Sequence, residues 1–254
     1  MKTGESRMCI NDWFTLVKID SCTYAFEERW SKEYCCCYLL YSEGEGLLID
    51  SGSGIGNIKE AVSSVFCGNI SILTTHTHFD HIGGHKYFSN RFVGSWELTK
   101  QEKFLGLEEI RQKLIRGIDP SHFPSDFSID DYYPFAGDYT WLIDREILSL
   151  QIGKRNLQVL HTPGHSAGHL CVYEEKTGYL FTGDLAYNGV ILVYDKPSFI
   201  RSINTLLALC PVNMILPGHN GPVSGGDILT NISKVMSNHI INVDKGIDFK
   251  IVYL

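Results

Sequence analysis

Residues 75–85 of the chain read THTHFDHIGGH and directly follow the apolar run 72–74, which is typical of a buried strand. Four potential metal ligands lie within six positions there, namely His76, His78, Asp80 and His81. Extended residues two apart project to the same side, so the first pair can hold one ion. The second pair lies past the bend that follows the strand and can face a second ion a few ångströms away.

These four residues indicate a metal site only when they are considered together. A lone histidine usually packs or forms hydrogen bonds, and that interpretation would hold for any one of them taken singly. Three imidazoles and a carboxylate this close together would repel protons and leave polar atoms unpaired unless a cation joined them. The stretch therefore predicts a metal site at the end of a strand.

The chain has the length of a typical enzyme domain and a net negative charge. Because 44% of its 254 residues are hydrophobic, the chain can bury a large core, and residues 1–254 are expected to form one domain. The net charge is −7 and the sequence has no run of lysine or arginine, so it lacks the basic surface that a nucleic-acid partner requires. A small-molecule substrate is expected instead, and the sequence leaves the oligomeric state open.

The start of the chain and its cysteines indicate a compartment. Residues 1–11 are polar, and no window has the length and apolarity of a signal or a membrane span, so a cytoplasmic protein is expected. The eight cysteines lack zinc-finger spacing and are expected to be reduced, mostly buried thiols. In the run 35–37, strand alternation puts the middle thiol on the opposite face from its neighbours, which predicts no ligand cluster.

Short apolar strands alternate with amphipathic helices, which predicts an α/β protein with helices covering sheets. The expected strands are 13–19, 37–41, 47–50, 71–74, 157–161, 170–173, 179–182 and 214–216. The expected helices are 57–66, 97–116, 198–209 and 227–240. Ser198 and Asp227 are expected to cap the N-termini of the last two.

Residues 95–144 differ in composition from the rest of the chain and are interpreted as an insertion. A charged helix is followed there by a loop rich in proline and aromatic residues. The seven rings belong to Phe123, Phe127, Tyr132, Tyr133, Phe135, Tyr139 and Trp141. Long ordered connections are often lids or pocket walls, but the rings can equally well pack the insertion onto the core, and both alternatives stay open.

The pattern HxHxDH at residues 76–81 resembles the signature of the metallo-β-lactamase superfamily, and further motifs follow in that family's order. They are Asp50 at a strand end, His165 in TPGHS, Asp184 in TGD and His219 in LPGH. The resemblance covers roughly residues 13–239. It implies an αββα four-layer sandwich with two divalent metal ions.

The resemblance also implies a role for each matching residue. The first ion would be held by His76, His78 and His165, the second by Asp80, His81 and His219, and Asp184 would bridge both together with a hydroxide. Asp80 would in addition orient that hydroxide, and Asp50 would orient the ligands. Zinc is the expected metal because it suits such ligand sets, while iron and manganese are bound by the same ligands in neighbouring members.

The residue types at this site favour one part of the superfamily. Some β-lactamases have cysteine at the position of Asp184. The aspartate here resembles the one found in the hydrolases of thioesters, lactones and phosphodiesters. Tyr187 matches a tyrosine of the acyl-homoserine lactonases that can donate a hydrogen bond to a developing oxyanion, although it can also be a pocket-wall ring. A closer resemblance, in residues 26–30, 183–189 and 216–220, is to the branch called metallo-β-lactamase domain-containing protein 2.

That branch is associated with acyl-CoA thioester hydrolysis. The resemblance therefore implies a hydrolase of the thioester and ester class, acting on an acyl-CoA or a glyoxalase II-like thioester, although no basic C-terminal tract like that of glyoxalase II is obvious. A lactonase is the first alternative, and a phosphodiesterase is disfavoured by the acidic balance. The non-enzymatic alternative is a metal-based redox or sensing module, but such members carry a flavin domain that this length does not accommodate.

Overall fold

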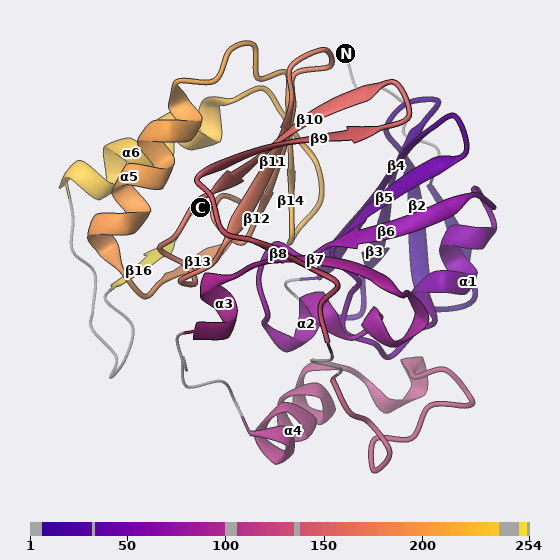
Figure 1. The fold of residues 1–254 in the computed structure, drawn as a ribbon. Coiled ribbons are helices and arrows are strands. Elements are labelled where there is room, and N and C mark those ends of the chain that lie inside the picture. Colours follow the sequence, from indigo (N-terminus) through magenta and orange to yellow (C-terminus); the bar gives the residue numbers. More distant parts are fainter. Residues whose placement is uncertain (1–6, 32–33, 100–105, 135–137, 239–248, 253–254) are drawn as a thin grey trace.

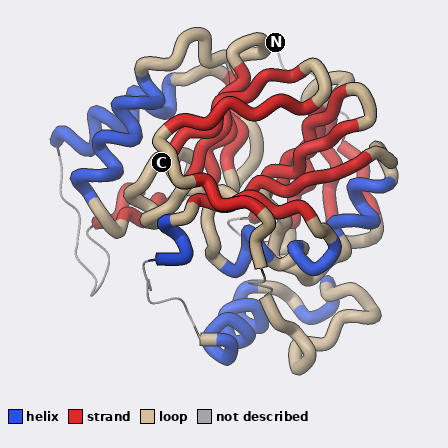
Figure 2. The backbone as a smooth tube through the Cα atoms, viewed as in Figure 1, coloured by secondary structure: helices blue, strands red, loops and turns tan. Residues whose placement is uncertain are grey.

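The computed structural model describes residues 7–31, 34–99, 106–134, 138–238 and 249–252. Two β-sheets lie against each other in the middle of the molecule, with helices on their outer faces (Figures 1 and 2). The mixed α/β architecture is therefore confirmed, with the layer order helix, sheet, sheet, helix. None of the helices in these ranges combines the length and the apolar character needed to span a membrane.

The first sheet has eight strands that follow one another in chain order. They are β1 (Arg7–Ile10), β2 (Phe14–Lys18), β3 (Thr23–Glu28), β4 (Cys35–Ser42), β5 (Glu45–Ile49), β6 (Asn69–Leu73), β7 (Asn90–Gly94) and β8 (Trp141–Ile143). Pairing is antiparallel from β1 to β5 and parallel from β5 to β8. The parallel step from β5 to β6 requires a crossover, and α1 (Ile58–Ser63) supplies it.

The second sheet has the strand order β15-β14-β12-β11-β10-β9. Its strands are β9 (Ile147–Ile152), β10 (Arg155–His161), β11 (Leu170–Glu174), β12 (Tyr179–Gly183), β14 (Met214–Pro217) and β15 (Val223–Ser224). Only β12 and β14 pair in parallel, and α5 (Lys196–Leu207) lies between them in the sequence. A separate pair joins β13 (Val190–Val193) to β16 (Phe249–Val252).

The hydrophobic core consists of three clusters that match the layers. One lies between the two sheets and takes alternate residues of β4, among them Tyr38 and Leu40. The intervening residues Cys37 and Leu39 point the other way and pack with α1. The third cluster joins the second sheet to α5 and α6 (Asp227–Asn238). The period-2 alternation along a strand that is covered on both faces produces this division.

The expected strands are all present within a few residues, and two of the expected helices differ. The helix expected at 97–116 occurs as two pieces, α3 (Trp96–Thr99) and α4 (Leu107–Gly117), with 100–105 outside the described residues. The prediction that Ser198 is an N-cap is wrong. Asp195 caps α5 and accepts a hydrogen bond from the Ser198 amide at 3.2 Å, because a proline in the first turn suits an earlier start.

The aromatic rings of the 95–144 segment have more than one environment. Phe123 stacks on Trp13 with ring centroids 6.4 Å apart, and the Tyr132 hydroxyl donates a hydrogen bond to the Ser53 carbonyl at 2.8 Å. Tyr133 and Trp141 are instead 66% and 57% exposed. Phe135 lies outside the described residues. Part of the segment therefore packs onto the core, and its role as a lid or pocket wall stays a prediction.

Candidate metal centre

The predicted ligands come from loops at the ends of strands in both sheets. The loop after β6 carries His76 and His78, and α2 (Phe79–Ile82) begins directly after them. This short helix turns the chain away from the strand direction, as the sequence predicts for the second pair of ligands. His165 follows β10, whereas Asp184 and His219 follow the parallel strands β12 and β14, whose carboxyl ends share one edge of the second sheet.

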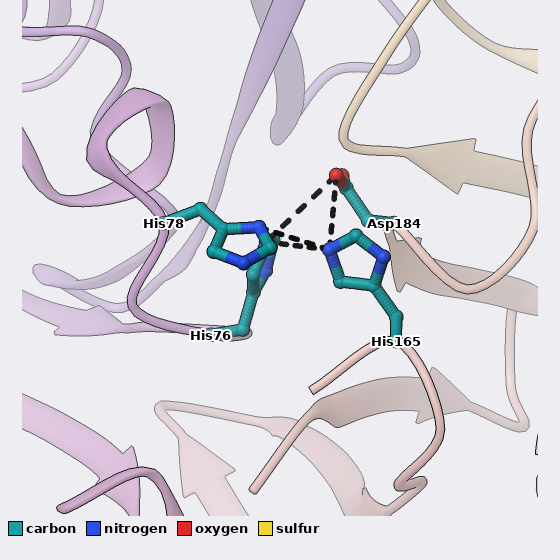
Figure 3. Close-up of side chains that lie close together, drawn as sticks. All are labelled: His76, His78, His165 and Asp184. Carbon is teal, nitrogen blue, oxygen red and sulfur yellow. Dashed lines mark hydrogen bonds and ion pairs between the residues drawn. The ribbon is translucent and has the colours of Figure 1, made fainter. Parts of the chain in front are cut away.

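The first cluster contains three imidazoles and one carboxylate that converge on one point (Figure 3). His165 Nε2 lies 3.2 Å from His76 Nε2 and 3.0 Å from His78 Nδ1, and the latter two atoms are 2.9 Å apart. The Asp184 Oδ2 atom lies 3.5 Å from His165 Nε2 and 3.8 Å from His76 Nε2. The first ligand group predicted from the sequence is thus brought together, with Asp184 beside it.

Hydrogen bonds on the far side of two rings fix which nitrogen carries the proton. The Thr75 hydroxyl donates to Asp50 Oδ2 at 2.8 Å, so it accepts from His76 Nδ1 at 3.0 Å. His165 Nδ1 donates to the Leu192 carbonyl at 2.8 Å. Both rings therefore present an Nε2 lone pair, and two lone pairs 3.2 Å apart cannot bond to each other. A cation between them satisfies both.

Burial keeps these rings neutral. Burial, together with the neighbouring histidines, lowers the pKa of His78 to about 3 and that of His76 well below its ordinary value. Burial also lowers the pKa of His165. A neutral imidazole is the form that binds metal ions, so the cluster has its ligand form at neutral pH.

The second cluster contains His81, His219 and Asp80, and it shares Asp184 with the first. His219 Nε2 lies 3.3 Å from Asp184 Oδ2 and 3.7 Å from Asp80 Oδ2, and His81 Nε2 lies 3.3 Å from Asp184 Oδ1. Both His81 Nε2 and Asp184 Oδ1 are buried and lack a hydrogen-bond partner among the described residues. Buried polar atoms without a hydrogen-bond partner are rare in proteins, so these two atoms favour a bound ion beside them.

The electrostatics of this cluster require positive charge. Burial would lower the pKa of His81, but Asp184, Asp50 and Asp80 together raise it well above its ordinary value. The pKa of His219 is raised in the same way, mainly by Asp184. Burial opposes ionisation of Asp184, yet the surrounding histidines lower its pKa well below its ordinary value. A divalent cation would supply the charge that these carboxylates otherwise take from protons.

Asp50 accepts hydrogen bonds from both ends of the segment after β6 that carries His76, His78, Asp80 and His81. Its carboxylate accepts from the Thr75 amide at 2.7 Å, from the Thr75 hydroxyl at 2.8 Å and from His81 Nδ1 at 2.9 Å. Asp50 has a φ of 59°, a conformation that aspartate tolerates better than most residues. These contacts orient His76 and His81, which is the role that the family resemblance implies for this residue.

Glu97 is a supporting residue that the sequence analysis missed. Its Oε2 accepts from the Thr77 amide at 2.9 Å and the Thr77 hydroxyl at 2.8 Å. Its Oε1 accepts from the Gly168 amide at 2.8 Å and from the Ser166 hydroxyl. One buried carboxylate therefore ties the loop of His76 and His78 to the loop of His165. A single glutamate in an expected helix gives no sequence signal of this contact.

Tyr187 lies beside the second cluster, with its ring centroid 5.2 Å from that of His219. Its side chain is buried, and its hydroxyl donates to the Val190 carbonyl. Because a hydroxyl has one proton, this bond competes with donation to an oxyanion. Tyr194 lies beside the first cluster, with its ring centroid 5.9 Å from that of His165 and 6.2 Å from that of His78, and it is 36% exposed.

We therefore expect Tyr187→Phe to lower kcat by less than about threefold and to leave the metal content unchanged, because the hydroxyl contributes one hydrogen bond within the fold. The measurement is kcat with metal analysis, alongside Tyr173→Phe as the matched control, because Tyr173 is also buried and its hydroxyl also donates to a backbone carbonyl. A loss of kcat of about tenfold or more in Tyr187→Phe alone would show instead that it is an oxyanion donor, as the sequence suggests.

The comparisons place this geometry in a protein class. Residues 32–219 match the family model described as Metallo-beta-lactamase superfamily, and the chain therefore belongs to this superfamily of metallo-hydrolases, whose members bind divalent metals. A solved metallo-beta-lactamase from Pontibacter korlensis has the same fold, with a TM-score of 0.61 at 15% identity over 89% of this chain and 100% of that one.

Two curated relatives are similar over most of their length. The acyl-coenzyme A thioesterase MBLAC2 of Bos taurus is 25% identical over 233 residues, which is 82% of this chain and 81% of the relative. The hydroxyacylglutathione hydrolase GloC of Haemophilus influenzae is 28% identical over 193 residues, 72% of this chain and 84% of the relative. The family resemblance stated from the motifs is thus confirmed, including its likeness to the MBLAC2 branch.

Proposed function

We propose that this chain hydrolyses a thioester, such as an acyl-CoA or an acyl-glutathione, with two divalent metal ions, most suitably zinc. The observation that carries the proposal is the pair of facing lone pairs on His76 and His165, next to a second cluster that shares Asp184. Both relatives described above are named as hydrolases of thioesters, which supports the substrate class.

The donors fit such ions. His76, His78 and His165 would hold the first ion, Asp80, His81 and His219 the second, and Asp184 lies between both groups. In tetrahedral coordination with bonds near 2.1 Å, two nitrogen or oxygen ligands are about 3.4 Å apart, and several of the distances above are close to this value. When bound, ions of this kind lower the pKa of water and polarise a carbonyl group.

Asp80 is the residue best placed to handle the attacking water. Its side chain is 18% exposed, compared with 7% for Asp184, so it lies on the open side of the cluster. His81 and His219 keep its pKa below the ordinary value although burial opposes this. The Asp80 carboxylate therefore stays ionised and can accept a hydrogen bond from the water, which holds its oxygen toward the substrate carbonyl.

The 95–144 segment borders this open side. The Lys113 ammonium of α4 lies 5.2 Å from the centroid of the Phe79 ring, next to Asp80, and contributes to lowering the Asp80 pKa. The Tyr132 hydroxyl is fixed on Ser53 in the same region. We propose that this segment forms one wall of the substrate site, whose apolar rings would contact an acyl chain.

We also propose that the chain acts in a reducing compartment such as the cytoplasm. All eight cysteines lie in described residues and are free thiols. Secreted proteins usually pair their cysteines in disulfides, whereas cytosolic proteins keep them reduced.

A substrate panel on the metal-loaded protein tests the function. We expect kcat/KM for the best thioester to exceed that for an acyl-homoserine lactone and for a phosphodiester by about 10²-fold or more, since the site must distinguish leaving groups. Release of free thiol and acid in equal amounts identifies the reaction. An acyl-CoA series of increasing chain length should show a rising kcat/KM if the aromatic segment contacts the acyl group.

A lactone as the best substrate would instead establish the lactonase alternative. No turnover of any carbonyl substrate by protein with two bound ions would contradict the proposal.

A further inference from the structure

Cys35 is a buried thiol at the edge of the second cluster. It is the first residue of β4, and its backbone pairs with that of His219 through an isolated bridge. The next amide, of Cys36, donates to the Gly218 carbonyl at 2.8 Å, which fixes the start of β4 against the loop after β14. The first thiol of the cysteine run is thereby held beside two of the predicted ligands, whereas Cys36 and Cys37 pack in two different apolar clusters, so the run itself gives no ligand cluster, as expected.

The position of the sulfur is that of a ligand. Cys35 Sγ lies 3.6 Å from Asp80 Oδ2, and His219 Nε2 lies 3.7 Å from the same oxygen. One donor atom of each residue lies within 4.8 Å of the other two. With zinc–sulfur and zinc–oxygen bonds of about 2.3 and 2.1 Å, tetrahedral angles place the two ligand atoms about 3.6 Å apart.

A second observation is that two further buried donor atoms beside this group have no hydrogen-bond partner in the part of the chain that the structure describes. Asp184 Oδ1 and His81 Nε2, which border the same space, are buried and have no hydrogen-bond partner among the described residues. Two carboxylates, two imidazoles and a thiol thus meet around these atoms. A protein interior tolerates such a set when a cation lies among the donors.

We propose that Cys35 is a ligand of the second metal ion, together with Asp80 and His219. The inference rests on the metal centre proposed above and adds a sulfur donor to it. When the metal–sulfur bond forms, the thiol proton leaves to solvent. Thiolate ligands favour zinc, cobalt and cadmium over manganese and magnesium, so the second position selects thiophilic ions.

Cobalt substitution provides a readout that does not depend on activity. Protein freed of metal and loaded with two equivalents of Co²⁺ should show a near-ultraviolet sulfur-to-cobalt charge-transfer band. Cys35→Ser should lose this band and bind the second Cd²⁺ about tenfold or more weakly, with little change for Mn²⁺. Cys37→Ser is the matched control, because Cys37 is also buried, two residues further along β4, but packs in the apolar cluster with α1, and it should keep the band.

The outcomes separate this inference from the proposed function. Two bound cobalt ions without the band in the unmodified protein, or a band that persists in Cys35→Ser, would overturn the role of Cys35 and leave the metal centre intact. Binding of fewer than two cobalt ions would contradict both. If Cys35→Ser does not fold, as judged by circular dichroism, the same measurements are made on Cys35→Ala. Absence of the band from the unmodified protein would still overturn the role of Cys35.

Discussion

Asp184→Asn is expected to lower kcat/KM for the best thioester by at least about 10²-fold and to remove metal from both clusters, because a damaged ligand set loses affinity on this scale. The Asp184 carboxylate is the group that the two clusters share. Its Oδ2 lies 3.5 Å from His165 Nε2 in the first and 3.3 Å from His219 Nε2 in the second. Its Oδ1 lies 3.3 Å from His81 Nε2.

The substitution removes charge and changes little else. Asparagine has nearly the volume of aspartate, so the fold should persist, but its amide cannot ligate two ions as a carboxylate does. The pKa of His81 and of His219 is raised mainly by Asp184, against the effect of burial, so both should fall in the variant. The site would then hold neither the protons nor the ions that the carboxylate attracts.

The measurements are metal content, kcat/KM and the free energy of unfolding. Asp144→Asn is the control, because Asp144 is an exposed aspartate whose side chain is 71% accessible, and it should leave all three unchanged. Near-normal turnover with two ions bound in Asp184→Asn would refute the shared-ligand assignment.

The proposed ligands differ in how far the sequence alone could locate them. His76 and His78 are predictable from local geometry, because alternate residues at a strand end share a side. His165, Asp184 and His219 are distant in sequence, and they could be located only by the order of the family motifs. Cys35 could not be found in this way, because its position depends on the pairing of β4 with the loop after β14, a contact between the two sheets.

The fold shows the same limit. Strands with uninterrupted apolar runs, such as β12, were predictable from hydrophobicity. The strand β3 was missed because its sequence, TYAFEE, ends in two acidic residues. Glu28 is nevertheless buried there, since Trp13 Nε1 donates to it at 2.8 Å and the Ser53 amide at 3.0 Å. Burial of a charged residue is decided by partners that lie far away in the sequence.

Glu97→Gln is expected to weaken binding of the first ion by about 10- to 100-fold, the range found when a residue that positions metal ligands is changed. The Glu97 carboxylate uses both oxygens to accept four hydrogen bonds, two from Thr77 and the others from Ser166 and Gly168. Glutamine replaces one of the two oxygens with an NH₂ group, which is a donor. That group would face either the donors of Thr77 or those of Ser166 and Gly168, and it cannot accept their hydrogen bonds. The loop that carries those donors loses its restraint, so His165 no longer keeps its place beside His76 and His78.

A positioning role and a merely structural one give different results. Excess zinc should restore most of the activity of Glu97→Gln, because weak binding is overcome by concentration, whereas an unfolded variant would not recover. The second ion, whose ligands Glu97 does not contact, should keep its affinity within about threefold, as expected when the change acts locally. Glu175→Gln, an exposed glutamate at the far end of β11, serves as the matched control. Unchanged affinity for the first ion in Glu97→Gln would show that the two ligand loops hold their positions without this carboxylate.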